Sequence, residues 1–115
     1  MKTPSSGKLL RIFIGEQDKW RGQPLYEAIV HLARKEKLAG ATVLKGCMGF
    51  GRNSHMHTAK LLRLSEDLPM VIEIVDNEEK INAFLPALDE MVQEGLMTLE
   101  NVNIVMYRAN QASAQ

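Results

Sequence analysis

Six hydrophobic segments lie along this chain. The spacing of apolar residues differs between them, and the order of these spacings restricts the folds that the chain can adopt. Two segments have apolar residues at helical spacing, and four have the alternation or β-branched composition of strands. Their order is strand, helix, strand, strand, helix, strand, with no repeat at solenoid spacing. This order predicts an α+β domain of the ferredoxin-like βαββαβ type, an antiparallel sheet with two helices on one face.

The strands are expected where apolar residues alternate or β-branched residues cluster. In the first, Leu10, Ile12 and Ile14 alternate with other residues up to Gly15. A bulge or turn is expected at Pro69, because proline cannot donate a hydrogen bond to a central ladder. The remaining strands are expected at residues 42–44, at 60–64 with a continuation at 70–75, and at 102–107.

The helices are expected at residues 24–39 and between the third and last strands. The second should begin at Asp76, which has capping-box spacing to Glu79. Pro86 lies inside it and predicts a bend, since an interior proline removes a helical hydrogen bond. Gly95 is expected to close this helix in a left-handed conformation.

Several strands carry apolar side chains on both faces. Phe13 and Ile12 are consecutive, as are Val71 and Ile72, so on a strand the two apolar side chains of each pair would point to opposite faces. Helices on one side of the sheet cannot cover both sets. We therefore expect one sheet face to be bare and to form an interface between copies of the chain.

The length of 115 residues predicts a single domain, 1–115, with loose polar termini at 1–7 and 110–115. Equal numbers of basic and acidic residues argue against nucleic acid as a partner. The apolar runs are far shorter than the ~20 residues of a membrane span. Cys47 is the only cysteine, so no internal disulfide can form, and nothing at the start resembles a signal peptide. We expect a cytoplasmic protein.

The segment Gly49-Phe50-Gly51-Arg52 is the strongest candidate for ligand binding. Its glycines allow a ligand to approach the backbone closely, and its arginine suits a phosphate. The spacing matches neither the P-loop nor the dinucleotide fingerprint, and no helix N-terminus follows. From the residues alone, a plain hairpin turn and a ligand loop both remain open.

A metal site is a second interpretation of the same region. His55 and His57 alternate, so on a strand they would point the same way, and imidazole suits zinc or copper. Two ligands do not complete a site, and His31 lies far off in the first helix. A solvated loop is the competing interpretation, and no metal ligand is assigned.

No nucleophile with a matching acid–base pair stands out, so we do not expect an enzyme. Cys47 is expected to be a buried thiol at a strand end. Trp20 lies in a charged loop, where it could pack on its own chain, contact a neighbouring subunit or stack on a base. The paired acids are expected to cap helices or face solvent; they are Glu66-Asp67, Glu78-Glu79 and Asp89-Glu90.

Longer motifs carry a resemblance that covers nearly the whole chain. They resemble the family known as domain of unknown function 190, a branch of the PII-like superfamily of nitrogen-regulatory proteins. The motifs are Gly15-Glu16-x-Asp18-Lys19-Trp20-x-Gly22-x-Pro24-Leu25-Tyr26-Glu27-Ala28-Ile29, Ala39-Gly40-Ala41-Thr42-Val43, Gly49-Phe50-Gly51, His57-Thr58, and Leu64-Ser65-Glu66-Asp67-Leu68-Pro69-x-Val71-Ile72-Glu73-Ile74-Val75-Asp76.

The resemblance implies a homotrimer that binds adenine nucleotides in clefts between subunits and signals through a long loop. Thr42 matches the strand residue near the adenine, and Val75 a strand residue of the same cleft. Gly49–Arg52 matches the base of the signalling loop, which would extend over 49–58. The resemblance also implies a protein partner, with a membrane transporter as one candidate.

The chain departs from the PII pattern before its last strand. PII proteins carry a glycine-aspartate-glycine-lysine phosphate loop there, whereas residues 95–101 read Gly-Leu-Met-Thr-Leu-Glu-Asn. Of the arginines that PII places in the last strand, only Arg108 has a counterpart. The resemblance therefore favours AMP or ADP over a triphosphate. A CutA-like metal-binding trimer that uses His55 and His57 is the alternative.

Overall fold

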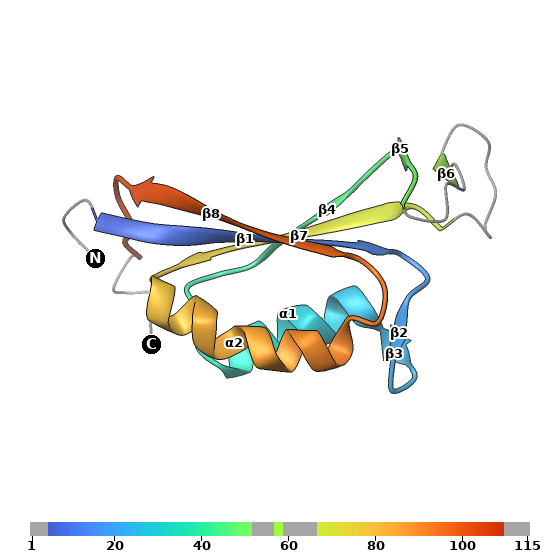
Figure 1. The fold of residues 1–115 in the computed structure, drawn as a ribbon, viewed down its shortest axis with the longest axis horizontal. Helices are drawn as coiled ribbons and strands as arrows, with labels where there is room; N and C mark the ends of the chain where they lie inside the picture. The colour runs from blue at the N-terminus through green and yellow to red at the C-terminus, as the bar shows by residue number, and fades with distance from the viewer. Residues whose placement is uncertain (1–4, 52–56, 59–66, 110–115) are drawn as a thin grey trace.

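An antiparallel sheet of four strands carries both helices on one of its faces (Figure 1). The computed structural model describes residues 5–51, 57–58 and 67–109. The sheet has the order β4-β7-β1-β8, and every neighbouring pair is antiparallel. Along the chain, the four strands of this sheet and the two helices occur in the order β1 (Ser5–Gly15), α1 (Leu25–Lys35), β4 (Thr42–Lys45), β7 (Pro69–Asp76), α2 (Glu78–Met91) and β8 (Leu96–Ile104). The predicted ferredoxin-like βαββαβ fold is confirmed.

Two small hairpins lie at the end of the sheet where β1 ends and β7 begins (Figure 1). One joins β2 (Lys19–Trp20) to β3 (Gln23–Pro24), and the other pairs β5 (Met48–Gly49) with β6 (His57–Thr58). The strand arm expected at 60–64 lies outside the described residues.

The core forms because the apolar residues of one parity in β1 and β7 face the helices. Ile12 is opposite Ile72 in the register, and both are fully buried. Each helix adds one apolar stripe to this layer. The largest fully buried side chains are Leu10, Ile12, Ile29, Ile72, Ile74, Ile81 and Leu88. In the described part of the chain, neither helix is long and apolar enough to cross a membrane.

The edges of several elements differ from the prediction. Residues 5–7, expected in a loose terminus, belong to β1 and pair with the end of β8. The cap of α2 is Asn77 rather than Asp76, because the Asn77 side chain accepts a hydrogen bond from the backbone N–H of Lys80. Asp76 instead accepts from the backbone N–H of Ala39, at 2.9 Å. The helix continues through Pro86 to Met91.

The last strand begins earlier than predicted. β8 starts at Leu96 and ends at Ile104, because residues 96–104 pair with β1 along its length. Gly95 therefore precedes a strand rather than closing α2, whose cap is Val92. A Cβ atom at Gly95 would lie 2.6 Å from the carbonyl oxygen of Phe13, so the chain can enter the sheet here only through glycine.

Candidate functional site

None of the helices and strands that the structure describes covers the sheet face opposite α1 and α2. The register places alternate residues of all four strands on it, because successive side chains in a strand point to opposite faces. Leu44 and Leu96 keep 49% and 57% of their surface exposed there. The residues on this open face are Leu9, Arg11, Phe13, Thr42, Leu44, Val71, Glu73, Val75, Leu96, Thr98 and Glu100.

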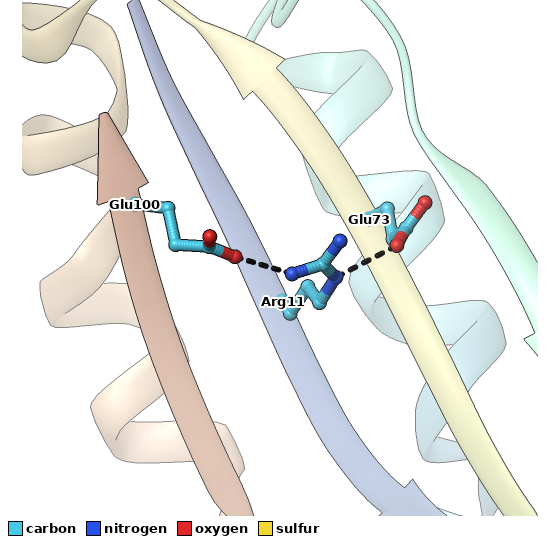
Figure 2. A network of polar contacts seen from close by, with 3 residues as sticks. All are labelled: Arg11, Glu73 and Glu100. Atoms are coloured by element: carbon cyan, nitrogen blue, oxygen red, sulfur yellow. Dashed lines mark hydrogen bonds and ion pairs between the residues drawn. The ribbon is translucent and has the colours of Figure 1, made fainter. Parts of the chain in front are cut away.

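A charged network occupies the middle of the open face (Figure 2). The Nε atom of Arg11 donates to Glu73 at 2.8 Å, and its Nη1 atom donates to Glu100. These side chains come from β1, β7 and β8, so the arginine lies between two carboxylates of neighbouring strands. The hydrogen bond to Glu73 raises the pKa of Arg11 and is the largest effect. Desolvation lowers this pKa, and the negative charges of Glu100 and Glu73 raise it further.

This network was not identified from the sequence as a functional feature, although a signal for it was present. Once Leu10 and Ile12 face the helices, the strand period places Arg11 on the other side of the sheet. With two carboxylates and one guanidinium, the network leaves one net negative charge on an otherwise largely apolar surface.

Two of the site residues expected from the resemblance lie on the open face. Thr42 is on β4, directly opposite Glu73 of β7 in the register. Val75 is on β7, opposite Leu9 of β1, and 37% of its surface is exposed. Both therefore border the charged network rather than the helical layer.

The glycine segment lies at one end of the sheet, against the start of β7. The backbone N–H of Gly46 donates to the carbonyl oxygen of Pro69 at 2.7 Å. A Cβ atom at Gly46 would come within 2.7 Å of the proline ring, and one at Gly49 within 3.1 Å. These close approaches explain the glycines as structural requirements of the turn. Phe50 is 65% exposed, and nothing lies within 4 Å of a Cβ atom at Gly51.

The expected site residues fall into two groups that are far apart in one subunit. Gly49 packs on Pro69, and Val75 is six residues further along β7, which corresponds to about 20 Å of extended strand. Arg108 belongs to the distant group, because the hydroxyl of the preceding Tyr107 donates to the carbonyl oxygen of Ala39 at 2.8 Å. Ala39 is bonded in turn to Asp76, at the end of β7. Arg52 lies outside the described residues.

An acidic loop follows β1 and holds the ends of three strands together. Glu16 forms an ion pair with Lys45, at the end of β4, at 2.7 Å. Asp67, just before β7, accepts from the backbone N–H of Gln17 at 2.6 Å. Asp18 accepts from the backbone N–H of Gly15, and its partial burial raises its pKa, with smaller contributions from Asp67 and Glu94. These contacts fix the position of the β4–β5 turn relative to β1 and β7.

Two further sequence interpretations can be compared with the structure. Cys47 is exposed, so the prediction of a buried thiol is wrong: the residue lies in the turn after β4, where the chain has left the sheet. Trp20 packs against the hydrophobic core from the β2–β3 hairpin, with the guanidinium of Arg21 4.9 Å from its ring centre. Trp20 therefore packs on its own chain, beside the helices.

The metal-binding alternative depends on His55 and His57. His55 lies outside the described residues, and of His57 only the backbone pairing in β6 is described. Over residues 5–51, 57–58 and 67–109, no group of three or more histidine, cysteine or acidic side chains could hold a metal ion.

Comparison with known proteins gives a consistent result in sequence and in fold. The profile of the DUF190 family, described as "Uncharacterized ACR", matches residues 7–104. A UPF0166 protein of Aquifex aeolicus is 40% identical over 98 residues, which cover 85% of this chain and 92% of that protein. Both comparisons extend across the whole βαββαβ unit.

The solved structures that resemble this chain include the PII-like protein CPII of Thiomonas intermedia K12. Its complex with ADP and bicarbonate superposes with a TM-score of 0.67 at 17% identity, covering 92% of this chain and 95% of CPII. Its complex with ADP, AMP and bicarbonate gives a TM-score of 0.66 at 18% identity, covering 92% and 94%. The chain thus belongs to the DUF190 family and has the fold of these PII-like proteins.

Proposed function

We propose that this protein is a PII-like regulator that binds AMP or ADP in clefts between the subunits of a homotrimer. Binding would order the 49–58 loop for a protein partner, for which a membrane transporter is one candidate. The observation that carries the proposal is the shared fold with CPII, whose structures hold ADP, or ADP together with AMP. The role is regulatory rather than catalytic.

The separation of the expected site residues supports a cleft between subunits. Gly49 and Phe50 lie at one end of β7, and Val75 and Arg108 lie toward the other. A nucleotide is too short to touch both groups in one chain, since about 20 Å of strand separates them. A second copy can bring the glycine end of one subunit beside the Val75 end of another.

The open face supplies the surface on which such an assembly would form. Leu44, Val75 and Leu96 are exposed there in the single subunit, and burying them would stabilise an oligomer. The Arg11 network lies among them, so its net negative charge would set which surfaces can meet. Threefold symmetry would place identical networks around one axis.

The conformation of residues 96–101 supports the preference for AMP or ADP over ATP. PII proteins carry their phosphate loop at this point, whereas residues 96–101 here are part of β8 and pair with β1. A strand in a continuous ladder has its backbone N–H groups engaged alternately by its neighbour and cannot wrap around a terminal phosphate. A site without this loop therefore suits AMP or ADP, which have fewer phosphates than ATP.

Calorimetric titration with AMP, ADP and ATP tests the proposal. We expect ADP or AMP to release heat and to bind more tightly than ATP, with one site per subunit. Replacing Arg108 with glutamine should weaken ADP binding about tenfold, which is the effect of losing one charge-assisted hydrogen bond to a phosphate. The matched control is Arg34→Gln, because Arg34 is exposed on α1 in the helical layer.

The outcome that overturns the proposal is the absence of heat with all three nucleotides from a folded protein whose mass in solution is that of a trimer. Equal weakening by Arg108→Gln and Arg34→Gln would remove Arg108 from the site. Thr42→Val provides a second test on the open face, with Thr98→Val on β8 as its matched control.

A further inference from the structure

A hollow on the helical side of the molecule has no part in the proposed nucleotide cleft. It lies between α1, α2 and the β2–β3 hairpin, and its volume is about 340 Å³. This volume is at the lower end of the range for small-molecule pockets, which is about 300–1,000 Å³. The open face lies on the other side of the sheet, so the two surfaces are separated by the core (Figure 1).

Small residues from both helices line the hollow. Ala28 of α1 and Ala87 of α2 both line it, and neither side chain can fill the space between the helices. Trp20 also lines the hollow and packs against the core. The lining therefore combines small apolar side chains and an aromatic ring with polar and charged groups.

The rim of the hollow carries more positive than negative charge. Arg21 and Lys35 line it together with a single carboxylate, Glu90, and with His31. The guanidinium of Arg21 lies over the Trp20 ring, 4.9 Å from its centre, a distance at which a cation and an aromatic ring attract each other. In the described part of the chain, neither Lys35 nor Glu90 takes part in an ion pair.

We propose that this hollow binds a small organic carboxylate with an apolar body, such as an aromatic or short aliphatic acid. One negative charge would balance the excess of one positive charge that Arg21, Lys35 and Glu90 leave at the rim. The carboxylate would accept hydrogen bonds from Arg21 and Lys35. The apolar body would lie between the helices against the alanines and the edge of Trp20.

Fluorescence provides a direct test, because Trp20 is the only tryptophan in the chain. We expect titration with benzoate to change the emission of Trp20 in a saturable manner, and benzyl alcohol, which lacks the charge, to bind at least tenfold more weakly. Lys35→Gln should weaken benzoate binding about tenfold. Arg34→Gln, the neighbouring position on α1 that does not line the hollow, should leave the affinity unchanged.

Filling the hollow is the second arm of the test. Ala87→Leu should abolish the benzoate effect, and a leucine suits a helix, so α2 should be retained. The indole N–H signal of Trp20 in two-dimensional NMR, with the melting temperature, shows whether the variant is folded and whether its hollow is occupied.

Three outcomes overturn the proposal: no saturable change in the wild type, an unchanged affinity in the Ala87→Leu variant, or equal loss in the Lys35 and Arg34 variants. The inference is independent of the proposed function, because ADP and AMP binding would be measured by calorimetry on the same protein without benzoate.

Discussion

At the level of single residues, chemistry in this protein depends on which side of the sheet a side chain occupies. Arg11 and Ile12 are neighbours in sequence, yet one joins two carboxylates on the open face and the other is fully buried under the helices. The strand period decides this, since consecutive residues point to opposite faces. The alternation in the sequence predicted the strand, but the partners of Arg11 come from β7 and β8, and only strand pairing brings them together.

Asp18 should make stability depend on pH. Its pKa is raised in the folded state, so the folded protein holds the proton more tightly than the unfolded chain, and the free energy of unfolding should fall as the pH rises through the interval above 3.8. Asp18→Asn should remove this fall while still accepting the hydrogen bond from Gly15. Urea denaturation at a series of pH values measures the difference between the two proteins.

The matched control is Asp89→Asn, which removes a carboxylate from the exposed side of α2. Its pH profile should follow that of the wild type. Superimposable profiles for the wild type and Asp18→Asn would contradict the assignment of this pH dependence to Asp18.

At the level of helices and strands, the period of apolar residues predicted which elements form, whereas local hydrogen bonds decided where they begin and end. The capping spacing in the sequence indicated Asp76, but Asn77 is the cap, because Asp76 is engaged by the backbone of the α1–β4 loop. β8 likewise begins at Leu96, where β1 offers a partner, although its alternation is clearest further on. Element boundaries depend on partners that a linear pattern does not contain.

Asn77→Ala should destabilise the protein by removing the side chain that accepts from the N–H of Lys80 at 2.8 Å. Loss of such a cap costs about 1 kcal/mol, so the urea midpoint should fall with an unchanged slope. Asn82→Ala is the control, since Asn82 is exposed within α2 and alanine favours the helix there. If both variants had the same stability, the cap would contribute nothing.

At the level of the whole molecule, the described part of the chain forms two layers, a sheet and a pair of helices, and leaves the other face of the sheet open. Both helices cover one face, and the other presents apolar side chains around a charged centre (Figures 1 and 2). The chain belongs to the DUF190 family and has a PII-like fold. In the proposed function a neighbouring copy completes the nucleotide site, so nucleotide binding would depend on assembly.

Leu44→Glu should weaken the proposed trimer. The side chain lies on the open face with 49% of its surface exposed, so in an assembly the substitution would bury a carboxylate beside Glu73. An unpaired buried charge is costly, and the dissociation constant should rise at least tenfold in sedimentation velocity.

Leu99→Glu is the matched control, because Leu99 is similarly exposed, at 42%, but follows the parity of β8 that faces the helices. Its assembly should be that of the wild type. Circular dichroism confirms that both variants are folded. A Leu44→Glu protein that remains fully trimeric would exclude this part of the open face from the interface.

The sequence by itself determined the fold class and the family, because hydrophobic period and motif spacing are properties of the linear chain. Only the tertiary structure decided that Arg11 joins Glu73 and Glu100, that Cys47 is exposed, and that two alanines leave a hollow beside Trp20. These features depend on contacts between residues distant in sequence. Such contacts arise when strands pair and helices pack, and no local pattern specifies which groups they bring together.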